Sequence, residues 1–138
     1  MRVLAPSWLR AGQVGPPGAG ARGGGAVGRE MPGAQVLGVN MEGPFISPSR
    51  KGAQKEEYVR DPDFDAFSSY WEESGRTIKL VDIAPERPHT QEFLRGAREL
   101  CTVSIAHTEA AYDEAMWAVR QGGTQATHLF NAMPGRTH

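Results

Sequence analysis

Residues 78–106 read IKLVDIAPERPHTQEFLRGARELCTVSIA, and this stretch decides the fold. Two short apolar runs, Ile78–Ile83 and Thr102–Ala106, flank a helix-like segment, Thr90–Leu100. Apolar runs that alternate with helical segments are typical of parallel strands joined by right-handed crossovers. The stretch therefore predicts a strand-helix-strand unit of a parallel α/β sheet.

The same alternation continues on both sides of this unit. Upstream lie an apolar run, Val36–Met41, and a helix-like segment, Asp63–Glu73; downstream lie a helix-like segment, Glu109–Gln121, and a last run, Thr124–Phe130. The chain thus predicts an α/β fold of about four parallel strands with intervening helices. Four strands cannot close an eight-stranded barrel, so the pattern fits a sheet or a partial (β/α)8 TIM-like barrel.

The last predicted helix, Glu109–Gln121, shows helical spacing of apolar residues and has candidate capping residues at both ends. Tyr112, Met116 and Val119 recur at spacings of four and three, which predicts that they form an apolar face. Thr108 is the candidate N-cap, and the Gly122-Gly123 pair is the candidate stop.

Residues 1–34 differ in composition from the rest of the chain. Gly, Pro, Ala and Arg dominate them, and such a stretch has too little apolar side-chain surface to offset the entropy lost on ordering. We expect a flexible lead-in over 1–34 and a folded part over 35–138.

Charge and cysteine content narrow the class of protein. The net charge of −1 gives no reason to expect nucleic acid or a membrane surface as a partner. A single cysteine, Cys101, excludes an internal disulfide, and no apolar targeting segment stands near Met1. These features predict a cytoplasmic location.

Ligand-type side chains stand where three of the apolar runs end. Glu42 follows the first run, His107 the third and His128 the fourth. Functional residues of parallel α/β folds gather at the carboxyl ends of strands, so these three side chains are expected to meet. Strand alternation places Glu42 on the face of Asn40, His107 on the face of Val103 and Ile105, and His128 on the face of Thr124 and Ala126.

One carboxylate and two imidazoles form a set that binds zinc and leaves a coordination position for water, as a catalytic site requires. The ion would lower the pKa of that water and polarise a carbonyl oxygen, which makes amide hydrolysis feasible at neutral pH. Iron or another divalent ion would also accept this set. Taken singly, each residue is more often a hydrogen-bonded structural group than a ligand.

Four motifs resemble the N-acetylglucosamine-6-phosphate deacetylases, a family of the amidohydrolase superfamily. They are MEGPFIS at 41–47, KGA at 51–53, VSIAHT at 103–108 and THLFNAMP at 127–134, and the resemblance covers about residues 35–138. It identifies the chain as a central fragment of a metal-dependent (β/α)8 hydrolase that removes acetate from N-acetylglucosamine 6-phosphate. The full-length family members are expected to be homo-oligomers.

The resemblance also implies roles for single residues. Glu42, His107 and His128 match the metal ligands, while Ala53, Asn131 and Ala132 match positions that hold the sugar phosphate. Asn40 and Gln54 stand where many members have histidine, and Gln54 is expected to keep a hydrogen bond to a sugar hydroxyl.

The family's catalytic aspartate has no counterpart in this chain, so no catalytic acid or base is assigned and little activity is expected of the fragment alone. Two alternatives remain: a non-catalytic truncated remnant, and a deacetylase of N-acetylgalactosamine 6-phosphate. The remaining groups have plainer interpretations. Trp71 and Trp117 are expected to pack, whereas Asp82, His89 and the run Lys55–Glu57 are expected to be solvated or loop groups.

Overall fold

The computed structural model describes residues 2–7, 27–29, 33 and 35–135. Its centre is a parallel sheet with the strand order β1-β2-β3-β4-β5. The strands are β1 (Arg2–Ser7), β2 (Gln35–Met41), β3 (Ile78–Ile83), β4 (Thr102–Ile105) and β5 (Gly123–Ala126). The helices are α2 (Phe64–Glu73), α3 (Thr90–Ala97) and α4 (Tyr112–Gln121), with 3₁₀ turns η1 (Pro48–Arg50) and η2 (Glu56–Tyr58).

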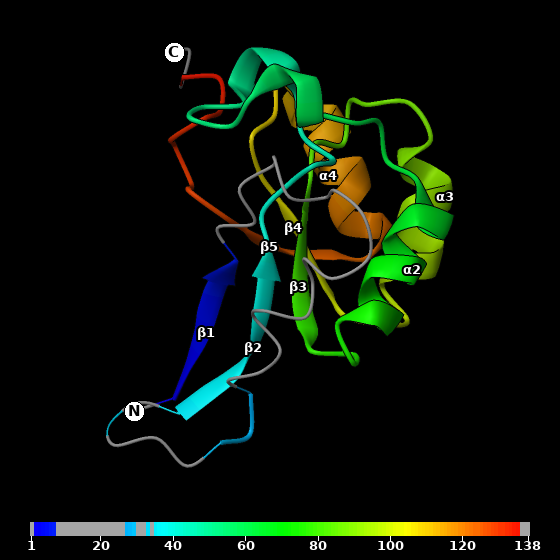
Figure 1. Ribbon diagram of the computed structural model, residues 1–138. Helices are drawn as coiled ribbons and strands as arrows, with labels where there is room; N and C mark the ends of the chain where they lie inside the picture. Colours follow the sequence, from blue (N-terminus) through cyan, green and yellow to red (C-terminus); the bar gives the residue numbers. More distant parts are fainter. Residues whose placement is uncertain (1, 8–26, 30–32, 34, 136–138) are drawn as a thin grey trace.

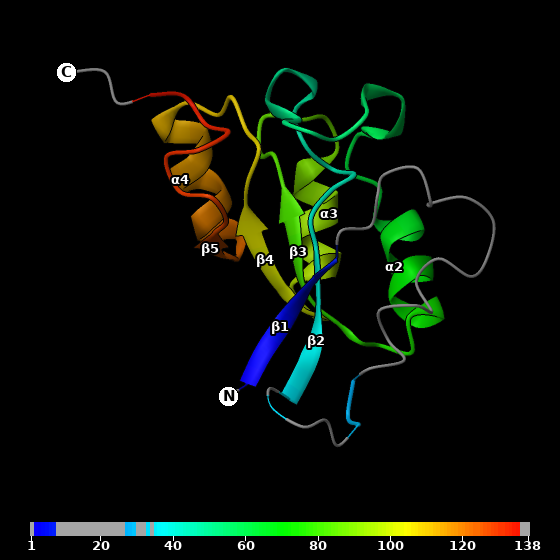
Figure 2. The same cartoon turned by 60° about the vertical axis from the view of Figure 1, so that its left-hand side comes forward.

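The three helices lie together on one side of the sheet (Figure 1). The turned view separates α4 from α2 and places α3 behind the middle strands (Figure 2). Because strands and helices alternate along the chain from β2 to β5, the α/β prediction is confirmed. The sheet stays open, since β1 and β5 do not pair with each other.

An additional strand, β1, was not predicted. It lies inside the stretch expected to be flexible, and it pairs in parallel with β2 from Arg2 opposite Gln35 to Ser7 opposite Met41. An edge strand presents unpaired N–H and C=O groups, and a neighbouring segment that satisfies them gains one hydrogen bond after another whatever its composition. Residues 2–7 of the predicted lead-in thus form a strand of the sheet, while residues 1, 8–26, 30–32 and 34 lie outside the described residues.

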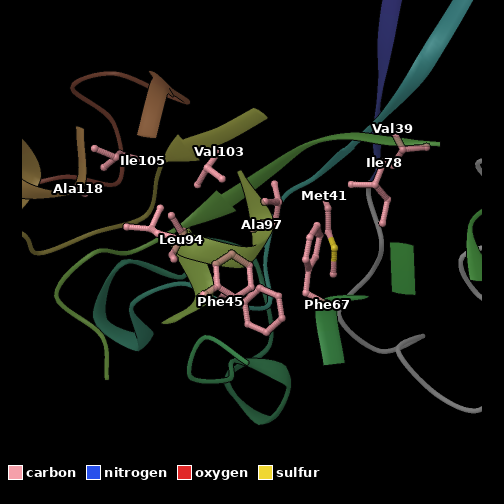
Figure 3. Packing of buried hydrophobic residues seen from close by; sticks show 13 residues of the cluster. Val39, Met41, Phe45, Phe67, Ile78, Leu94, Ala97, Val103, Ile105 and Ala118 are labelled. Atoms are coloured by element: carbon pink, nitrogen blue, oxygen red, sulfur yellow. The ribbon is translucent and has the colours of Figure 1, made fainter. Parts of the chain in front are cut away.

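The core lies between the sheet and the helices, as Figure 3 shows. Alternate residues of β2, β3 and β4 supply the sheet side, and Phe67, Phe93, Leu94 and Ala97 supply the helix side. The ring of Phe93 stacks at a tilt on Phe45 and Phe67, at centroid distances of 4.9 and 5.3 Å. Trp71 and Trp117 pack against this cluster, which confirms that they are packing residues.

This core fixes which way the strands face. Val39 and Met41 point to the helices, so Asn40 and Glu42 belong to the opposite face, as predicted. Val103 and Ile105 also point to the helices, so the expectation that they share an inward face with His107 is wrong. The Ser104 side chain instead points to the face of the sheet opposite the helices. His107 reaches that face because the chain changes direction after β4.

Helix α4 begins three residues later than the predicted cap at Thr108 would require. Ala111 is the N-cap, and its N–H donates to Glu114 Oε2 at 2.8 Å. Thr108 is otherwise engaged: its hydroxyl donates to Glu86 and accepts from the Ala110 N–H. At the other end the prediction is confirmed, because Gly122 closes the helix with a φ of 119°.

The predicted apolar face of α4 is not the face that packs against the rest of the protein. Tyr112 and Val119 are 76% and 47% exposed, and the helix buries Ala118 instead. Spacing identified a set of apolar residues but could not tell which side of the helix meets the sheet. In the part of the chain that the structure describes, no helix is long and apolar enough to cross a membrane.

Candidate metal centre

Three side chains from three strand ends meet above the sheet. Oε1 of Glu42, which follows β2, lies 2.7 Å from His107 Nε2 and 2.8 Å from His128 Nε2. His107 follows β4 and His128 follows β5. The imidazole rings stand edge to face at 87°, with centroids 5.3 Å apart. The sequence prediction that these three residues come together is confirmed.

Left-handed backbone turns aim the two histidines. His107 has a φ of 46° and His128 a φ of 54°, values that residues with a Cβ adopt at an energetic cost. Hydrogen bonds in the extended ladder hold the residues just before them: the Ala106 N–H donates to Ile83 O and the Thr127 N–H to Ile105 O, each at 3.0 Å. The chain then turns sharply, which carries each ring inward.

The loop after β2 orients His107 further. His107 Nδ1 lies 2.7 Å from Arg50 O, and the Ser47 N–H donates to His107 O at 2.9 Å. A carbonyl oxygen accepts only, so Nδ1 keeps its proton. Nε2 carries a second proton when it donates to Glu42 Oε1, and loss of that proton would leave the Nε2 lone pair as the ligand atom for a metal ion. Glu109 strengthens this connection, because it pairs with the Arg50 side chain and accepts from the Ser49 hydroxyl at 3.0 Å.

Glu42 and His107 stabilise each other's charged forms through their hydrogen bond. The hydrogen bond from His107 lowers the pKa of Glu42 despite the opposing effect of burial. The same bond raises the pKa of His107, again against desolvation. Both Nε2 atoms face Glu42 Oε1. A single cation bound between these three atoms would take the place of the protons that now join them.

The three ligand atoms also satisfy the distance that one ion requires. They all lie within 4.8 Å of one another. The Glu42 side chain is 16% exposed and the His107 side chain 7%, whereas that of His128 is 45% exposed. Two of the three candidate ligands are therefore held in the wall of the molecule, and the third lies on the solvent side.

Gln54 and the segment 131–132, which the resemblance assigns to the substrate, are hydrogen-bonded to this cluster or to the neighbouring Thr108. Gln54 Nε2 donates to Glu42 O at 3.2 Å, so Gln54 sits beside a ligand. The Asn131 N–H donates to His128 O at 2.6 Å, and Ala132 O accepts from the Thr108 N–H at 3.0 Å. Ala53 is exposed in the loop between η1 and η2.

Asp82 is the residue that sequence reasoning missed. It was expected to be a solvated or loop group, but it lies in β3 and is 0% exposed. Burial raises its pKa to about 6, although the Thr127 hydroxyl, donating to Oδ1 at 2.7 Å, opposes this shift. A charged residue between Val81 and Ile83, on the inward side of a strand, was the available signal. His89 and Lys55–Glu57 are exposed, as expected.

Comparison with known proteins agrees with the motifs. The chain is 40% identical over 102 residues to N-acetylglucosamine-6-phosphate deacetylase of Bacillus subtilis (strain 168), which covers 73% of this chain and 26% of that protein. The Homo sapiens protein of the same name is 42% identical over 105 residues, covering 73% of this chain and 25% of its own length. No family model matches the chain.

Solved structures give the same answer. A mutant N-acetyl-D-glucosamine-6-phosphate deacetylase from Mycobacterium smegmatis, in complex with N-acetyl-D-glucosamine-6-phosphate, superposes with a TM-score of 0.70 at 35% identity. That match covers 72% of this chain and 26% of the other. The enzyme from Pasteurella multocida gives 0.63 at 34% identity, covering 71% and 26%. This chain is therefore homologous to the N-acetylglucosamine-6-phosphate deacetylases and spans about one quarter of the length of the relatives it matches.

Proposed function

We propose that this chain carries the metal-binding part of an N-acetylglucosamine-6-phosphate deacetylase and acts in hydrolysis of the N-acetyl group as part of a longer enzyme. The products would be glucosamine 6-phosphate and acetate. The observation that carries the proposal is the meeting of Glu42, His107 and His128, whose ligand atoms lie within 4.8 Å of one another. Homology to enzymes of that name supplies the substrate.

Glu42, His107 and His128 are the residues that would hold a divalent ion. The donor set fits, because one carboxylate and two imidazoles suit zinc best among common divalent ions and also accept iron. The hydrogen bond between His107 Nδ1 and Arg50 O supports the same role, since it leaves Nε2 as the free ligand atom. When bound, such an ion supplies Lewis acidity toward an amide carbonyl and a water.

Other residues would orient the substrate. Ala53, through its backbone, and Asn131 with Ala132 would contact the sugar phosphate, and Gln54 would donate to a sugar hydroxyl. Gln54 and the segment 131–132 are hydrogen-bonded to Glu42, His128 and Thr108, so their positions are coupled to the ligands. Backbone amides bind phosphate oxygens well because they donate without carrying a mobile charge.

The proton-transfer aspartate of the reaction would lie outside this chain. Positioned acids and bases contribute about 10² to 10⁴-fold to rate. The chain by itself is therefore expected to bind metal and to show little or no turnover.

Metal affinity tests the assignment directly. We would titrate the metal-free chain with Zn²⁺ by isothermal calorimetry, alongside Glu42→Gln, His107→Ala and His128→Ala. Each variant is expected to lose at least about tenfold in affinity, because each removes one ligand. His89→Ala is the matched control, since His89 is an exposed histidine outside the cluster and should bind as the parent does. Equal affinity in all five proteins would refute the metal site.

A chimaera tests the substrate. Residues 35–135 would replace the corresponding segment of the Bacillus subtilis relative, which supplies the remainder of the enzyme. Acetate release from N-acetylglucosamine 6-phosphate is expected, and it should disappear with His107→Ala. A chimaera that folds and binds Zn²⁺ but prefers N-acetylgalactosamine 6-phosphate would contradict the assigned sugar. A folded, metal-loaded chimaera that turns over neither would support the remnant alternative.

A further inference from the structure

A chain of three hydrogen-bonded polar side chains, two of them buried and one half-buried, lies beneath the metal centre. Ser104 in β4, Thr127 after β5 and Asp82 in β3 join three neighbouring strands on the face away from the helices. Thr127 Oγ1 lies 2.7 Å from Asp82 Oδ1 and 2.8 Å from Ser104 Oγ. Asp82 and Ser104 are both 0% exposed.

The direction of the hydrogen bonds follows from the number of protons. The Thr127 hydroxyl has one proton and donates it to Asp82 Oδ1. The Ser104 hydroxyl must then donate to Thr127 Oγ1. Asp82 is therefore the terminal acceptor, and its position determines the rotamer of Thr127.

Thr127 is bonded directly to the outermost metal ligand. It precedes His128, whose side chain is 45% exposed and whose φ of 54° is disfavoured for a residue with a Cβ. The half-exposed His128 ring is held by Glu42 Oε1 and by the edge of the His107 ring, whereas His107 is buried and is also bonded to Arg50 O. The half-buried side chain of the preceding residue, Thr127, is anchored by the buried Asp82 and Ser104.

Burial of the Asp82 carboxyl group costs folding free energy. Its Oδ2 atom is buried and has no hydrogen-bond partner among the described residues. An unsatisfied buried carboxylate oxygen costs stability, so its presence at this position suggests a purpose other than packing. The groups that face Asp82 are the Thr127 hydroxyl, which donates to it, the neighbouring Ser104 hydroxyl, and Glu42 and His107 by charge.

We infer that Asp82, acting through the Thr127 hydroxyl, is the positioning residue that holds His128 toward Glu42. The inference rests on the proposed metal site. Asp82 touches no ligand itself, so its effect passes through one hydrogen bond and one peptide unit. Removing that hydrogen bond should loosen the His128 ring while leaving Glu42 and His107 in place.

The experiment compares variants that remove the hydrogen bond with variants that keep it. Thr127→Val and Asp82→Leu remove the donor and the acceptor, whereas Thr127→Ser and Asp82→Asn preserve them. Zn²⁺ affinity is expected to fall about tenfold in the first pair and to stay near the parent value in the second. Thermal unfolding of the metal-free proteins would identify any variant that fails to fold, and Thr127→Val, which is nearly isosteric, keeps the test usable if Asp82→Leu does not.

A second measurement needs no metal. Nitrogen-15 spectra of the His128 ring are expected to show one fixed tautomer in the parent and in Thr127→Ser, but averaged signals in Thr127→Val. Identical His128 spectra and equal Zn²⁺ affinity in Thr127→Val and the parent would overturn the inference.

The two proposals can fail separately. His128→Ala should bind Zn²⁺ more weakly if His128 is a ligand at all. Unchanged affinity in His128→Ala would reject the metal site, and the ring spectra would then decide alone whether Thr127 positions His128.

Discussion

At the scale of single residues, Asp82 gives the clearest pH dependence. Its pKa is about 6 in the folded protein because burial disfavours the charged form, against an ordinary value of 3.8. The folded state therefore binds this proton more tightly than the unfolded state. Stability from this group is present below pH 4 and is lost as the pH rises through 6, the opposite of an ion-paired carboxylate.

We expect Asp82→Asn to be more stable than the parent at pH 7 to 8. Asparagine keeps an acceptor for Thr127 and carries no charge to desolvate, so the gain is up to about 3 kcal/mol. Urea unfolding at pH 4 and pH 8 measures it, with the difference between the two proteins expected to vanish near pH 4. Asp65→Asn, an exposed aspartate in α2, is the control and should show no such pH-dependent gain. A gain of the same size at both pH values would contradict the raised pKa.

At the scale of elements, α3 depends on a missing side chain. Gly96 lies in α3, and a Cβ at this position would overlap the ring of Phe64, the first residue of α2. The glycine lets the two helices approach closely. Helix propensity alone favours alanine here by about 1 kcal/mol, so the two effects oppose each other.

We expect the steric effect to win. Gly96→Ala should destabilise the chain by about 1 to 3 kcal/mol, because a ring in contact with the core cannot move aside freely. Chemical denaturation of the variant measures this. The double variant Gly96→Ala with Phe64→Leu should recover part of the loss, and a Gly96→Ala protein more stable than the parent would show that Phe64 yields easily.

Helix α2 depends on its cap. Asp63 is the N-cap, and its side chain accepts from the Ala66 N–H at 3.0 Å. Asp63→Ala should cost about 1 kcal/mol, while Asp63→Asn, which still accepts that hydrogen bond, should cost far less. Thermal or urea unfolding would compare the two. Equal losses would mean that the charge of Asp63, and not the hydrogen bond, stabilises the helix start.

At the scale of the whole molecule, the described part of the chain leaves apolar surface open to solvent. Leu129 and Phe130 are 58% and 68% exposed beside the metal centre, and Tyr112 is 76% exposed on α4. Among the described residues, the two outer strands, β1 and β5, each pair along one edge and leave the other edge open. Exposed apolar patches and open edges both favour association.

The chain studied alone is therefore expected to self-associate as its concentration rises. Sedimentation velocity should show a growing dimer or larger species, and Leu129→Ser with Phe130→Ser should reduce it. Glu57→Ser, which changes an exposed charged residue and removes no apolar surface, serves as the control. A monomer over the full concentration range would refute this expectation.

Local pattern predicted much of this architecture. β3 was predicted with its observed ends, and α2 was predicted within one residue, because a run of six residues and an aspartate cap signal their own boundaries. The convergence of Glu42, His107 and His128 was also predicted, since parallel strands bring their carboxyl ends to one edge. The tertiary structure corrected the faces of β4 and α4, because periodicity defines which residues share a side but not which side is covered.

The sequence by itself determined the parallel α/β class, the family resemblance and the identity of the three candidate ligands, all of which depend on residue types and their spacing. Only the tertiary structure decided that β1 joins the sheet, that left-handed turns aim His107 and His128, and that Asp82 is buried beneath them. The physical reason is that pairing partners, turn directions and burial depend on contacts between residues distant in sequence. Those contacts form only when the sheet and helices pack together.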